Sequence, residues 1–307
     1  MDPTFRIGVD LGGTKIEGVL LAGDPIEPLL RFRRPTPRGQ GYEAIVDAVV
    51  AMVDSLRARA CGAERSIGVG IPGAVSSTHG RVKNANTTEL IGRPLQLDLE
   101  KRLGQRVRVE NDANCFALAE ALHGAGRGGR CVFGVILGTG VGGGIVLDGR
   151  IWPGAQGIAG EWGHNPLDPS GPPCYCGRRG CIETYLCGPA VEKAYREAGG
   201  DALAALEVWA LREKDPRARR IVDSYEERLA AALSLVVNIL DPDIIVLGGG
   251  ISRAPALAEG AARHMPSRLF NDEMLTAVRP NLLGDSAGVL GAAWLGCGAA
   301  NEANGTG

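Results

Sequence analysis

The sequence predicts an α/β protein of two lobes with a cleft between them. Segments with strand character alternate with longer segments that carry apolar residues at helical spacing. A strand, a glycine-rich turn and a second strand occur twice, in segments that begin at Ile7 and Gly134, 127 residues apart. The chain has 307 residues, which is enough for two domains, each with its own core.

The first part of the chain is expected to hold a hairpin, a buried strand and two helices. Its strands are predicted at residues 5–11, 16–21 and 66–71, and its helices at 41–60 and 112–122. The turn of the hairpin is Gly12-Gly13-Thr14, and Pro72-Gly73 ends the buried strand. Asp112 stands at the start of the second helix, and we expect it to cap that helix.

The second part repeats the hairpin and then becomes helical. Residues 131–147 form the second hairpin, 148–187 are rich in turns, and helices dominate from about 188 to 240. A strand at 244–247 leads into Gly248-Gly249-Gly250, and a last helix is expected at about 286–299. We assign residues 1–115 plus about 286–307 to a small N-terminal lobe, and residues 116–285 to a large lobe with a cysteine-containing loop at 161–183.

Composition argues against several classes of protein. Hydrophobic residues make up 45% and charged residues 22%, the balance of an ordinary globular protein, and the formal net charge is −2 with no basic block. We therefore expect no nucleic-acid partner. The longest uncharged apolar stretch, residues 131–147, contains six glycines, so we expect no membrane span. Eight cysteines are too few for a disulfide scaffold and indicate a reducing, cytoplasmic compartment.

Both glycine-rich turns are typical of phosphate binding. Glycine lets successive backbone N–H groups converge on one anion, and Thr14 and Thr139 add hydroxyl donors. Asp10, at the end of a strand, is placed to hold Mg²⁺ through water. Tight hairpins also favour glycine without any ligand. The dinucleotide fingerprint that begins at Gly138 lacks its following helix, and the chain contains no P-loop motif.

Three closely spaced cysteines and a histidine predict a metal site. Cys174, Cys176 and Cys181 follow His164 and together offer one imidazole and three thiolates, a set that fits a closed, structural Zn²⁺ site. Three free thiols in a loop are the alternative. Residues 161–183 are therefore expected to form a zinc-binding loop, in which His164 ligates zinc through one nitrogen and has the other free to bond elsewhere.

Asp112 is a candidate functional carboxylate. It stands between a strand and a helix, where the helix N-terminus keeps a carboxylate ionised. Helix capping alone is the alternative role.

Five motifs occur in one order and together resemble a known family. They are Asp10-Leu-Gly-Gly-Thr-Lys15, Gly70-Ile-Pro-Gly73, Glu110-Asn-Asp-Ala-Asn114, Leu137-Gly-Thr-Gly-Val-Gly-Gly-Gly144 and Leu247-Gly-Gly-Gly250. The set is similar to the ROK family of sugar kinases and repressors, which has the actin-like ATPase (ribonuclease H-like) fold. The resemblance implies a cleft enzyme that uses ATP and Mg²⁺, and its closest branch is the bacterial fructokinase (mannokinase) type.

The resemblance also implies roles for individual residues. Asp112 would be the general base and would touch the sugar. The other implied sugar contacts are Pro72, Gly73, Asn84, Asn111, Glu161, His164 and Glu183. The implied nucleotide contacts are Asp10, Gly12, Gly13, Thr14, Lys15, Gly138, Thr139, Gly140, Gly248, Gly249 and Gly250. Lys15 could instead point to solvent.

The expected reaction is ATP-dependent phosphorylation of a hexose at its 6-hydroxyl. We expect D-fructose as substrate, with mannose or glucose as secondary substrates. The alternatives are an N-acetylglucosamine kinase or glucokinase of the same family, and a sugar-sensing protein without catalysis. A ROK-type repressor would need a DNA-binding domain before its first strand, and we expect none, since that strand begins near residue 5. Family resemblance suggests a homodimer.

Overall fold

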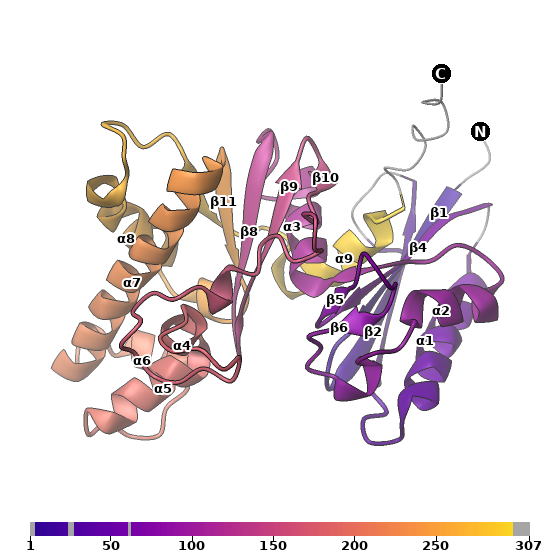
Figure 1. The fold of residues 1–307 in the computed structure, drawn as a ribbon, viewed down its shortest axis with the longest axis horizontal. Helices are drawn as coiled ribbons and strands as arrows, with labels where there is room; N and C mark the ends of the chain where they lie inside the picture. Colours follow the sequence, from indigo (N-terminus) through magenta and orange to yellow (C-terminus); the bar gives the residue numbers. More distant parts are fainter. Residues whose placement is uncertain (1–3, 24–27, 61–62, 297–307) are drawn as a thin grey trace. The chain divides into compact units, whose positions relative to one another are not determined.

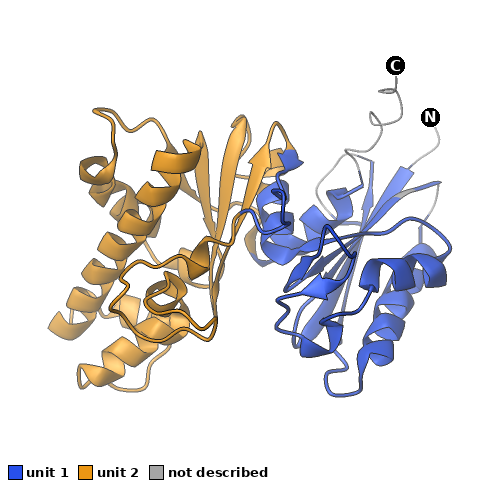
Figure 2. Ribbon diagram, in the orientation of Figure 1, with its two compact units in different colours: residues 1–119, 150–159, 285–307 blue, residues 120–149, 160–284 orange. Residues whose placement is uncertain are grey.

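Two hydrophobic cores form within the chain, one in each of two units (Figure 2). The computed structural model describes residues 4–23, 28–60 and 63–296. Unit 1 comprises residues 1–119, 150–159 and 285–307, and unit 2 comprises residues 120–149 and 160–284. The segment 150–159, which we assigned to the large lobe, thus belongs to unit 1.

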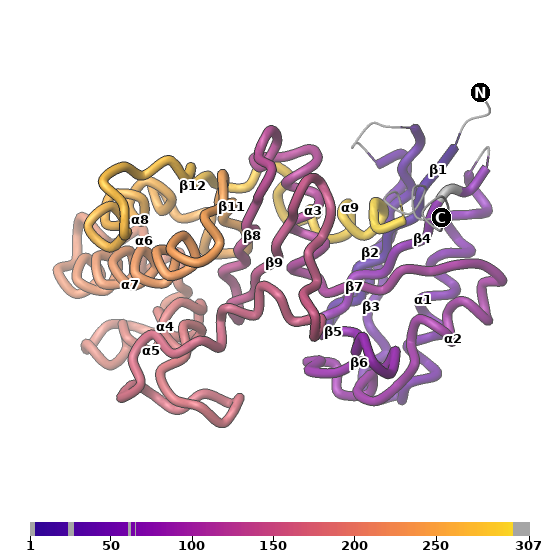
Figure 3. The backbone as a smooth tube through the Cα atoms, turned by 45° about the horizontal axis from the view of Figure 1, so that its top comes forward, coloured from indigo at the N-terminus to yellow at the C-terminus, as the bar shows by residue number. Residues whose placement is uncertain are grey.

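Unit 1 contains a sheet with the strand order β3-β2-β1-β4-β7 (Figures 1 and 3). The pairs β1–β2 and β2–β3 are antiparallel, whereas β1–β4 and β4–β7 are parallel. The strands of this sheet are β1 (Thr4–Leu11), β2 (Lys15–Ala22), β3 (Leu30–Pro35), β4 (Ala63–Ile71) and β7 (Arg108–Asn111). Two short strands of the unit, β5 (Ala74–Val75) and β6 (Val82–Lys83), form a separate antiparallel pair.

Helices cover both faces of this sheet. A Cβ on Gly18 of β2 would meet Met52 of α1, whereas a Cβ on Gly8 of β1 would meet Val289 of α9. Gly18 pairs with Val9, the neighbour of Gly8, so the two glycines face opposite sides. The helices of the unit are α1 (Tyr42–Arg57), α2 (Leu95–Leu103), the start of α3 (Asp112–His123) and α9 (Ala287–Trp294). Its 3₁₀ turns are η1 (Thr88–Leu90) and η5 (Gly284–Ser286), the latter continuing from unit 2.

Helix α9 lies unusually close to the sheet because glycines face it. Gly8 and Gly68 are partners in the β1–β4 ladder. A Cβ on Gly68 would overlap the carbonyl oxygen of Ala292, and a Cβ on Gly8 would overlap that of Val289. The backbone of α9 therefore occupies the space that side chains at these two positions would otherwise fill.

Unit 2 repeats the strand arrangement of unit 1. The strand order of its sheet is β10-β9-β8-β11-β12, where β10 is Arg150–Ile151; the pair β8–β9 is antiparallel, and β8–β11 and β11–β12 are parallel. A hairpin continued by parallel strands therefore occurs in both units, which is the duplication that the repeated sequence pattern predicts. The strands are β8 (Cys131–Leu137), β9 (Val141–Leu147), β11 (Ile244–Gly248) and β12 (Ala277–Pro280).

Most of the helical mass of unit 2 gathers around one long helix, α7. Helices α4, α5, α6 and α8 all contact it (Figure 1). The helices are α4 (Glu183–Leu186), α5 (Gly188–Glu197), α6 (Ala205–Ala210), α7 (Pro216–Leu240) and α8 (Leu257–His264). The 3₁₀ turns are η2 (Trp162–His164), η3 (Ile251–Arg253) and η4 (Pro266–Arg268).

Predicted and observed elements agree in type and differ at their ends. The helix predicted at 41–60 covers Tyr42–Arg57, and the strand predicted at 66–71 begins earlier, at Ala63. The last helix, predicted at about 286–299, covers Ala287–Trp294, and residues 297–299 lie outside the described residues. Within the described part of the chain, no helix is long and apolar enough to cross a membrane.

The close contact between α9 and β4 gives a stability prediction. Gly68→Ala places a methyl group against the carbonyl of Ala292, and we expect a loss of about 1–3 kcal/mol in the free energy of unfolding. Gly288→Ala is the matched control on α9, because a Cβ there meets no atom within 4 Å. Urea unfolding of both variants measures the difference. Equal stability of the two would show that the helix does not need this close approach.

Candidate active site

The parallel strands of unit 1 bring two predicted site residues to one edge of the sheet. Asp10 at the end of β1 pairs with Gly70 of β4, and Gly70 pairs with Glu110 of β7. Asp112 follows β7 by one residue and begins α3. Two strand spacings separate β1 from β7, or roughly 10 Å. The two carboxylates therefore stand on either side of the end of β4.

The surroundings of Cys115 show the same grouping of carboxylates. Burial raises the pKa of this thiol well above its ordinary value, and Glu110, Asp10 and Asp112 raise it further. Asp10 is itself perturbed. Burial and the neighbouring carboxylate of Glu17 raise its pKa to about 6, against the opposing effect of Lys15. A buried carboxylate of this kind favours a bound cation, because the cation offsets the cost of its charge.

Asn111, and not Asp112, caps helix α3. The Asn111 Oδ1 accepts hydrogen bonds from the backbone N–H groups of Ala113 (2.9 Å) and Asn114 (3.3 Å). Asp112 is the first helical residue, one position too late to be the cap, so our prediction of its capping role was wrong. Its Oδ1 does accept from the backbone of Ala113, at 2.8 Å. The Asn111 Nδ2 donates to the carbonyl of Gly73 at 3.0 Å, which ties the helix start to the end of β4.

The predicted sugar residues Pro72, Gly73 and Asn84 lie on two adjoining loops of unit 1. The backbone N–H of Asn86 donates to the carbonyl of Pro72 at 3.0 Å. A Cβ on Gly73 would lie 2.8 Å from the Cβ of Ala85, so only glycine allows this approach. Asn84 is exposed and adopts a φ of 54°, a left-handed conformation that asparagine tolerates.

The first glycine turn joins β1 to β2. The Gly12 N–H donates to the carbonyl of Lys15 at 3.0 Å, and the hydroxyl of Thr36 donates to the carbonyl of Gly12 at 2.7 Å. Gly12 and Gly13 are partly exposed and Thr14 is exposed, so this turn presents its backbone to solvent. Lys15 pairs with the buried carboxylate of Glu17 at 3.5 Å.

The second and third glycine turns lie against each other in unit 2. Gly138, Thr139 and Gly140 join β8 to β9, with the Gly138 N–H bonded to the carbonyl of Gly140 at 2.9 Å. Gly249 has a φ of 85°, and a Cβ on it would overlap Leu137, the residue just before the second turn. Gly248 ends β11 and Gly250 leads into η3. These turns thus form one glycine-lined surface.

Two hydrogen bonds connect the second turn to the segment after the cysteine cluster. The Glu183 carboxylate accepts from the backbone N–H of Val141 at 2.9 Å. A Cβ added to Gly140 would lie only 2.6 Å from the Glu183 Oε2. The N–H of Gly188, at the start of α5, donates to the carbonyl of Gly138 at 2.7 Å. The backbone of the second turn therefore holds the Glu183 carboxylate in place.

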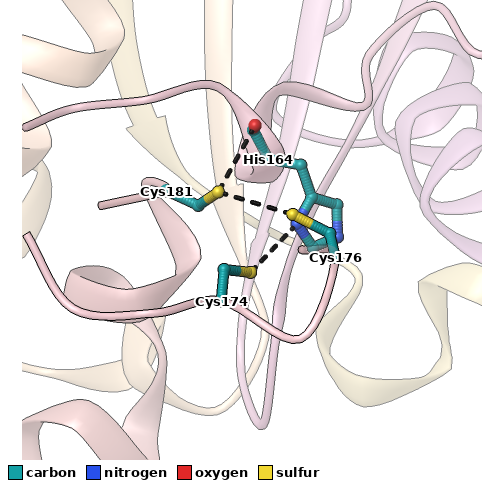
Figure 4. A group of neighbouring side chains, drawn as sticks. All are labelled: His164, Cys174, Cys176 and Cys181. Carbon is teal, nitrogen blue, oxygen red and sulfur yellow. Dashed lines mark hydrogen bonds between the residues drawn. The ribbon is translucent and has the colours of Figure 1, made fainter. Parts of the chain in front are cut away.

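The predicted metal ligands come together in unit 2. One ligand atom from each of His164, Cys174, Cys176 and Cys181 lies within 4.8 Å of the others, and Figure 4 shows them pointing toward one another. The Cys176 and Cys181 sulfurs are 3.6 Å apart. Tetrahedral zinc with bonds of about 2.3 Å separates two thiolate sulfurs by about 3.8 Å. The number, type and spacing of these ligands fit Zn²⁺.

Local backbone pairing builds this cluster. Pro166 pairs with Cys181 in an isolated antiparallel bridge, which brings the end of η2 beside the last cysteine. A second bridge, between Pro173 and Arg179, closes a small hairpin that carries Cys174 and Cys176. Gly177 at its tip has a φ of 87°, and the Arg178 guanidinium donates to the carbonyl of His164 at 3.1 Å.

The predicted sugar residue Glu161 precedes η2, which lies on β9. A Cβ on Gly163 would overlap the carbonyl of Val141, and the Trp162 Nε1 donates to the carbonyl of Gly142 at 2.9 Å. The indole is buried and meets Phe133 edge-on, with 5.6 Å between ring centroids. Trp162 thereby anchors the turn and leaves Glu161 exposed beside His164.

Tyr175 is a residue that our sequence reasoning passed over. Its hydroxyl forms a 3.0 Å hydrogen bond with the Nε2 of His164, and the two rings meet edge-on at 5.1 Å. Partial desolvation of the hydroxyl raises the pKa of Tyr175 to about 12, although most of the side chain is exposed. The phenol is therefore bonded to one predicted sugar contact, His164. The sequence feature that could have identified Tyr175 is its position between two predicted ligand cysteines.

Comparison with known proteins identifies the family. The family model described as "ROK family" matches residues 6–298. The chain belongs to the ROK family. An N-acetyl-D-glucosamine kinase from Pectobacterium atrosepticum is 38% identical over 300 residues, covering 94% of this chain and 97% of that protein. The predicted resemblance to the ROK family is thus confirmed.

Solved structures of the family have the same fold. The ROK hexokinase from Thermus thermophilus matches with a TM-score of 0.84 and 33% identity, covering 95% of this chain and 97% of that one. A ROK glucokinase from Streptomyces griseus, in complex with glucose and AMPPNP, matches with a TM-score of 0.79 and 30% identity, covering 95% and 98%. The predicted actin-like ATPase fold is confirmed. The preference for a fructokinase is not supported, because the relatives favour the N-acetylglucosamine kinase that we held as the alternative.

Proposed function

We propose that this ROK protein is an N-acetyl-D-glucosamine kinase, which transfers the terminal phosphoryl group of ATP to the 6-hydroxyl of the sugar. The arrangement of Asp10 and Asp112 in unit 1 carries the proposal. Asp10 stands at the end of strand β1 and strand β7 leads into Asp112, and the two strands lie about 10 Å apart at one sheet edge, which leaves room for a phosphoryl group between a cation-bound phosphate and an acceptor hydroxyl. The choice of sugar rests on the P. atrosepticum relative.

Asp112 is the proposed general base. Its position in the first turn of α3 keeps the carboxylate ionised, because the N-terminal end of a helix favours negative charge. Asn111 holds that helix start against Gly73. In this role Asp112 would orient the 6-hydroxyl and accept its proton as the phosphoryl group arrives.

Asp10 and the glycine turns are the proposed nucleotide site. Asp10 would hold Mg²⁺ through water, and the backbone N–H groups of both hairpin turns would hold phosphate oxygens. The third turn, at Gly248–Gly250, would lie near the adenosine.

A structural zinc ion is the proposed occupant of the cysteine cluster. Four protein ligands leave no open position, so the metal would shape the loop without activating water. With His164 bound through Nδ1, its Nε2 would be available to a sugar hydroxyl. Glu183, two residues after the last ligand, would contact the same sugar.

Two alternatives and two further predictions remain. A glucokinase is the second candidate, supported by the S. griseus enzyme with bound glucose. A sugar-sensing protein without catalysis would not need the carboxylate pair Asp10 and Asp112.

A homodimer and a cytoplasmic location stay predictions. Light scattering of the purified chain measures the number of subunits.

A panel of sugars tests the proposed function. N-Acetyl-D-glucosamine, N-acetyl-D-mannosamine, D-glucose, D-mannose and D-fructose are compared in a coupled assay of ADP release. We expect the highest kcat/KM for N-acetyl-D-glucosamine. Higher kcat/KM for glucose would establish the second candidate, and no ADP release with any sugar would support the sensing protein.

Replacement of the proposed base tests the mechanism. Asp112→Asn keeps the shape of the side chain but removes its basicity, so we expect kcat to fall by ~10² or more. Calorimetry should show sugar affinity within about threefold of wild type, since the amide still accepts a hydrogen bond. Asp54→Asn, on the exposed side of α1, is the matched control and should keep its activity. Near-normal turnover of Asp112→Asn would remove Asp112 from the role of base.

Removal of one ligand tests the metal proposal. Cys176→Ser should lower bound zinc from about one per chain to a small fraction, because serine is a poor ligand for this ion. Sugar affinity should fall with the zinc, since the metal orders the loop of His164 and Glu183. Cys131→Ser, outside the cluster, should retain both. Mass-spectrometric metal analysis gives the zinc content, and an unchanged value in Cys176→Ser would show that the four residues hold no zinc.

A further inference from the structure

The imidazole of His164 is engaged on both of its nitrogens. Its Nδ1 faces the metal cluster, 3.6 Å from the sulfur of Cys174. Its Nε2 is hydrogen-bonded to the phenol of Tyr175 at 3.0 Å. When Nδ1 is bound to a metal, Nε2 carries the ring hydrogen and has one hydrogen bond to donate. A sugar hydroxyl and the phenol would therefore use the same atom.

We propose that Tyr175 is a gate on the sugar site, which occupies the Nε2 of His164 in the empty enzyme and leaves it when a sugar hydroxyl binds there. The inference rests on the proposed function, because it takes His164 as a sugar contact. It assigns Tyr175 a specific part in that contact. A sugar that offers a hydroxyl at this point replaces the lost hydrogen bond, whereas a sugar that lacks it leaves the gate closed.

The placement of Tyr175 allows its ring to move without disturbing the metal ligands. The side chain is 77% exposed, so little packing holds it over the imidazole. Its backbone is held on both sides by ligand cysteines, and the bridge between Pro173 and Arg179 closes the hairpin below it. Rotation of the side chain therefore opens Nε2 while the four ligand atoms stay in place.

Two predicted sugar contacts lie close to the gate in the chain. Glu161 directly precedes η2, which contains His164, and the Glu183 carboxylate is held by the N–H of Val141. With His164 they are the sugar contacts predicted in unit 2, so a sugar hydroxyl that binds the imidazole would compete with the phenol for Nε2.

Removal of the phenol hydroxyl should tighten sugar binding. Tyr175→Phe keeps the ring but leaves water as the competitor for Nε2. We expect the Kd for N-acetyl-D-glucosamine, measured by calorimetry on the zinc-loaded full chain, to fall by about twofold to tenfold, the range for one hydrogen bond. The KM for this sugar should fall with it. Tyr185→Phe is the matched control, since its hydroxyl meets Asp168 at 3.5 Å and not the imidazole; its Kd should equal that of wild type.

Deoxy sugars identify the hydroxyl that displaces the gate. The 1-deoxy, 3-deoxy and 4-deoxy forms of N-acetyl-D-glucosamine are titrated against wild type and Tyr175→Phe. The gain from Tyr175→Phe should persist for the forms that keep the relevant hydroxyl and vanish for the one that lacks it. A purely structural role for Tyr175 would weaken the binding of every sugar alike. Zinc content equal to wild type shows that the loop is intact, and Tyr175→Ala provides a second variant with the same expected direction.

The outcomes separate this inference from the proposed function. Wild-type chain that binds none of these sugars overturns both. Wild-type chain that binds and phosphorylates N-acetyl-D-glucosamine, together with a Kd for Tyr175→Phe that is unchanged or weaker, overturns the gate alone. A gain that persists for all three deoxy forms also rejects it, because the phenol would then compete with no sugar hydroxyl.

Discussion

The parallel register of β1, β4 and β7 is the constraint on which the site in unit 1 depends. Backbone hydrogen bonds align Asp10, Gly70 and Glu110, so the carboxyl ends of the three strands reach the same edge of the sheet. A shift of one residue in the pairing of either strand pair would move the buried side chains of the shifted strand to the opposite face of the sheet. The spacing of Asp10 and Asp112 is therefore set by the sheet, and loops only complete it.

Glycine makes this sheet and its turns possible. On the sheet, Gly8 and Gly68 let the backbone of α9 lie directly on the strands. In unit 2, Gly249 lies on Leu137 in the same manner, which brings two glycine turns together. The high glycine content thus serves two ends: close packing between backbones, and the tight turns that join the strands.

The cysteine cluster and the second glycine turn form one connected structure in unit 2. Glu183 and Gly188 both bond to the turn, and Glu183 stands two residues after the last ligand of the cluster. His164 and Tyr175 lie on the two segments that the cluster joins. A metal at this point would order the groups proposed to meet the sugar and, through Glu183, the turn proposed to meet phosphate.

The sequence by itself determined the fold class, the repeated hairpin and the identity of the four clustered ligands. These features depend on local patterns: period-two strands, glycine between them, and the spacing of cysteines. Tertiary structure alone decided which residue caps α3, because an asparagine and an aspartate side by side both suit a cap and only the backbone dihedral angles choose between them. It also placed Tyr175 on His164. Such relations join residues whose distance in space the sequence pattern does not encode, since they arise only when separate segments pack against each other.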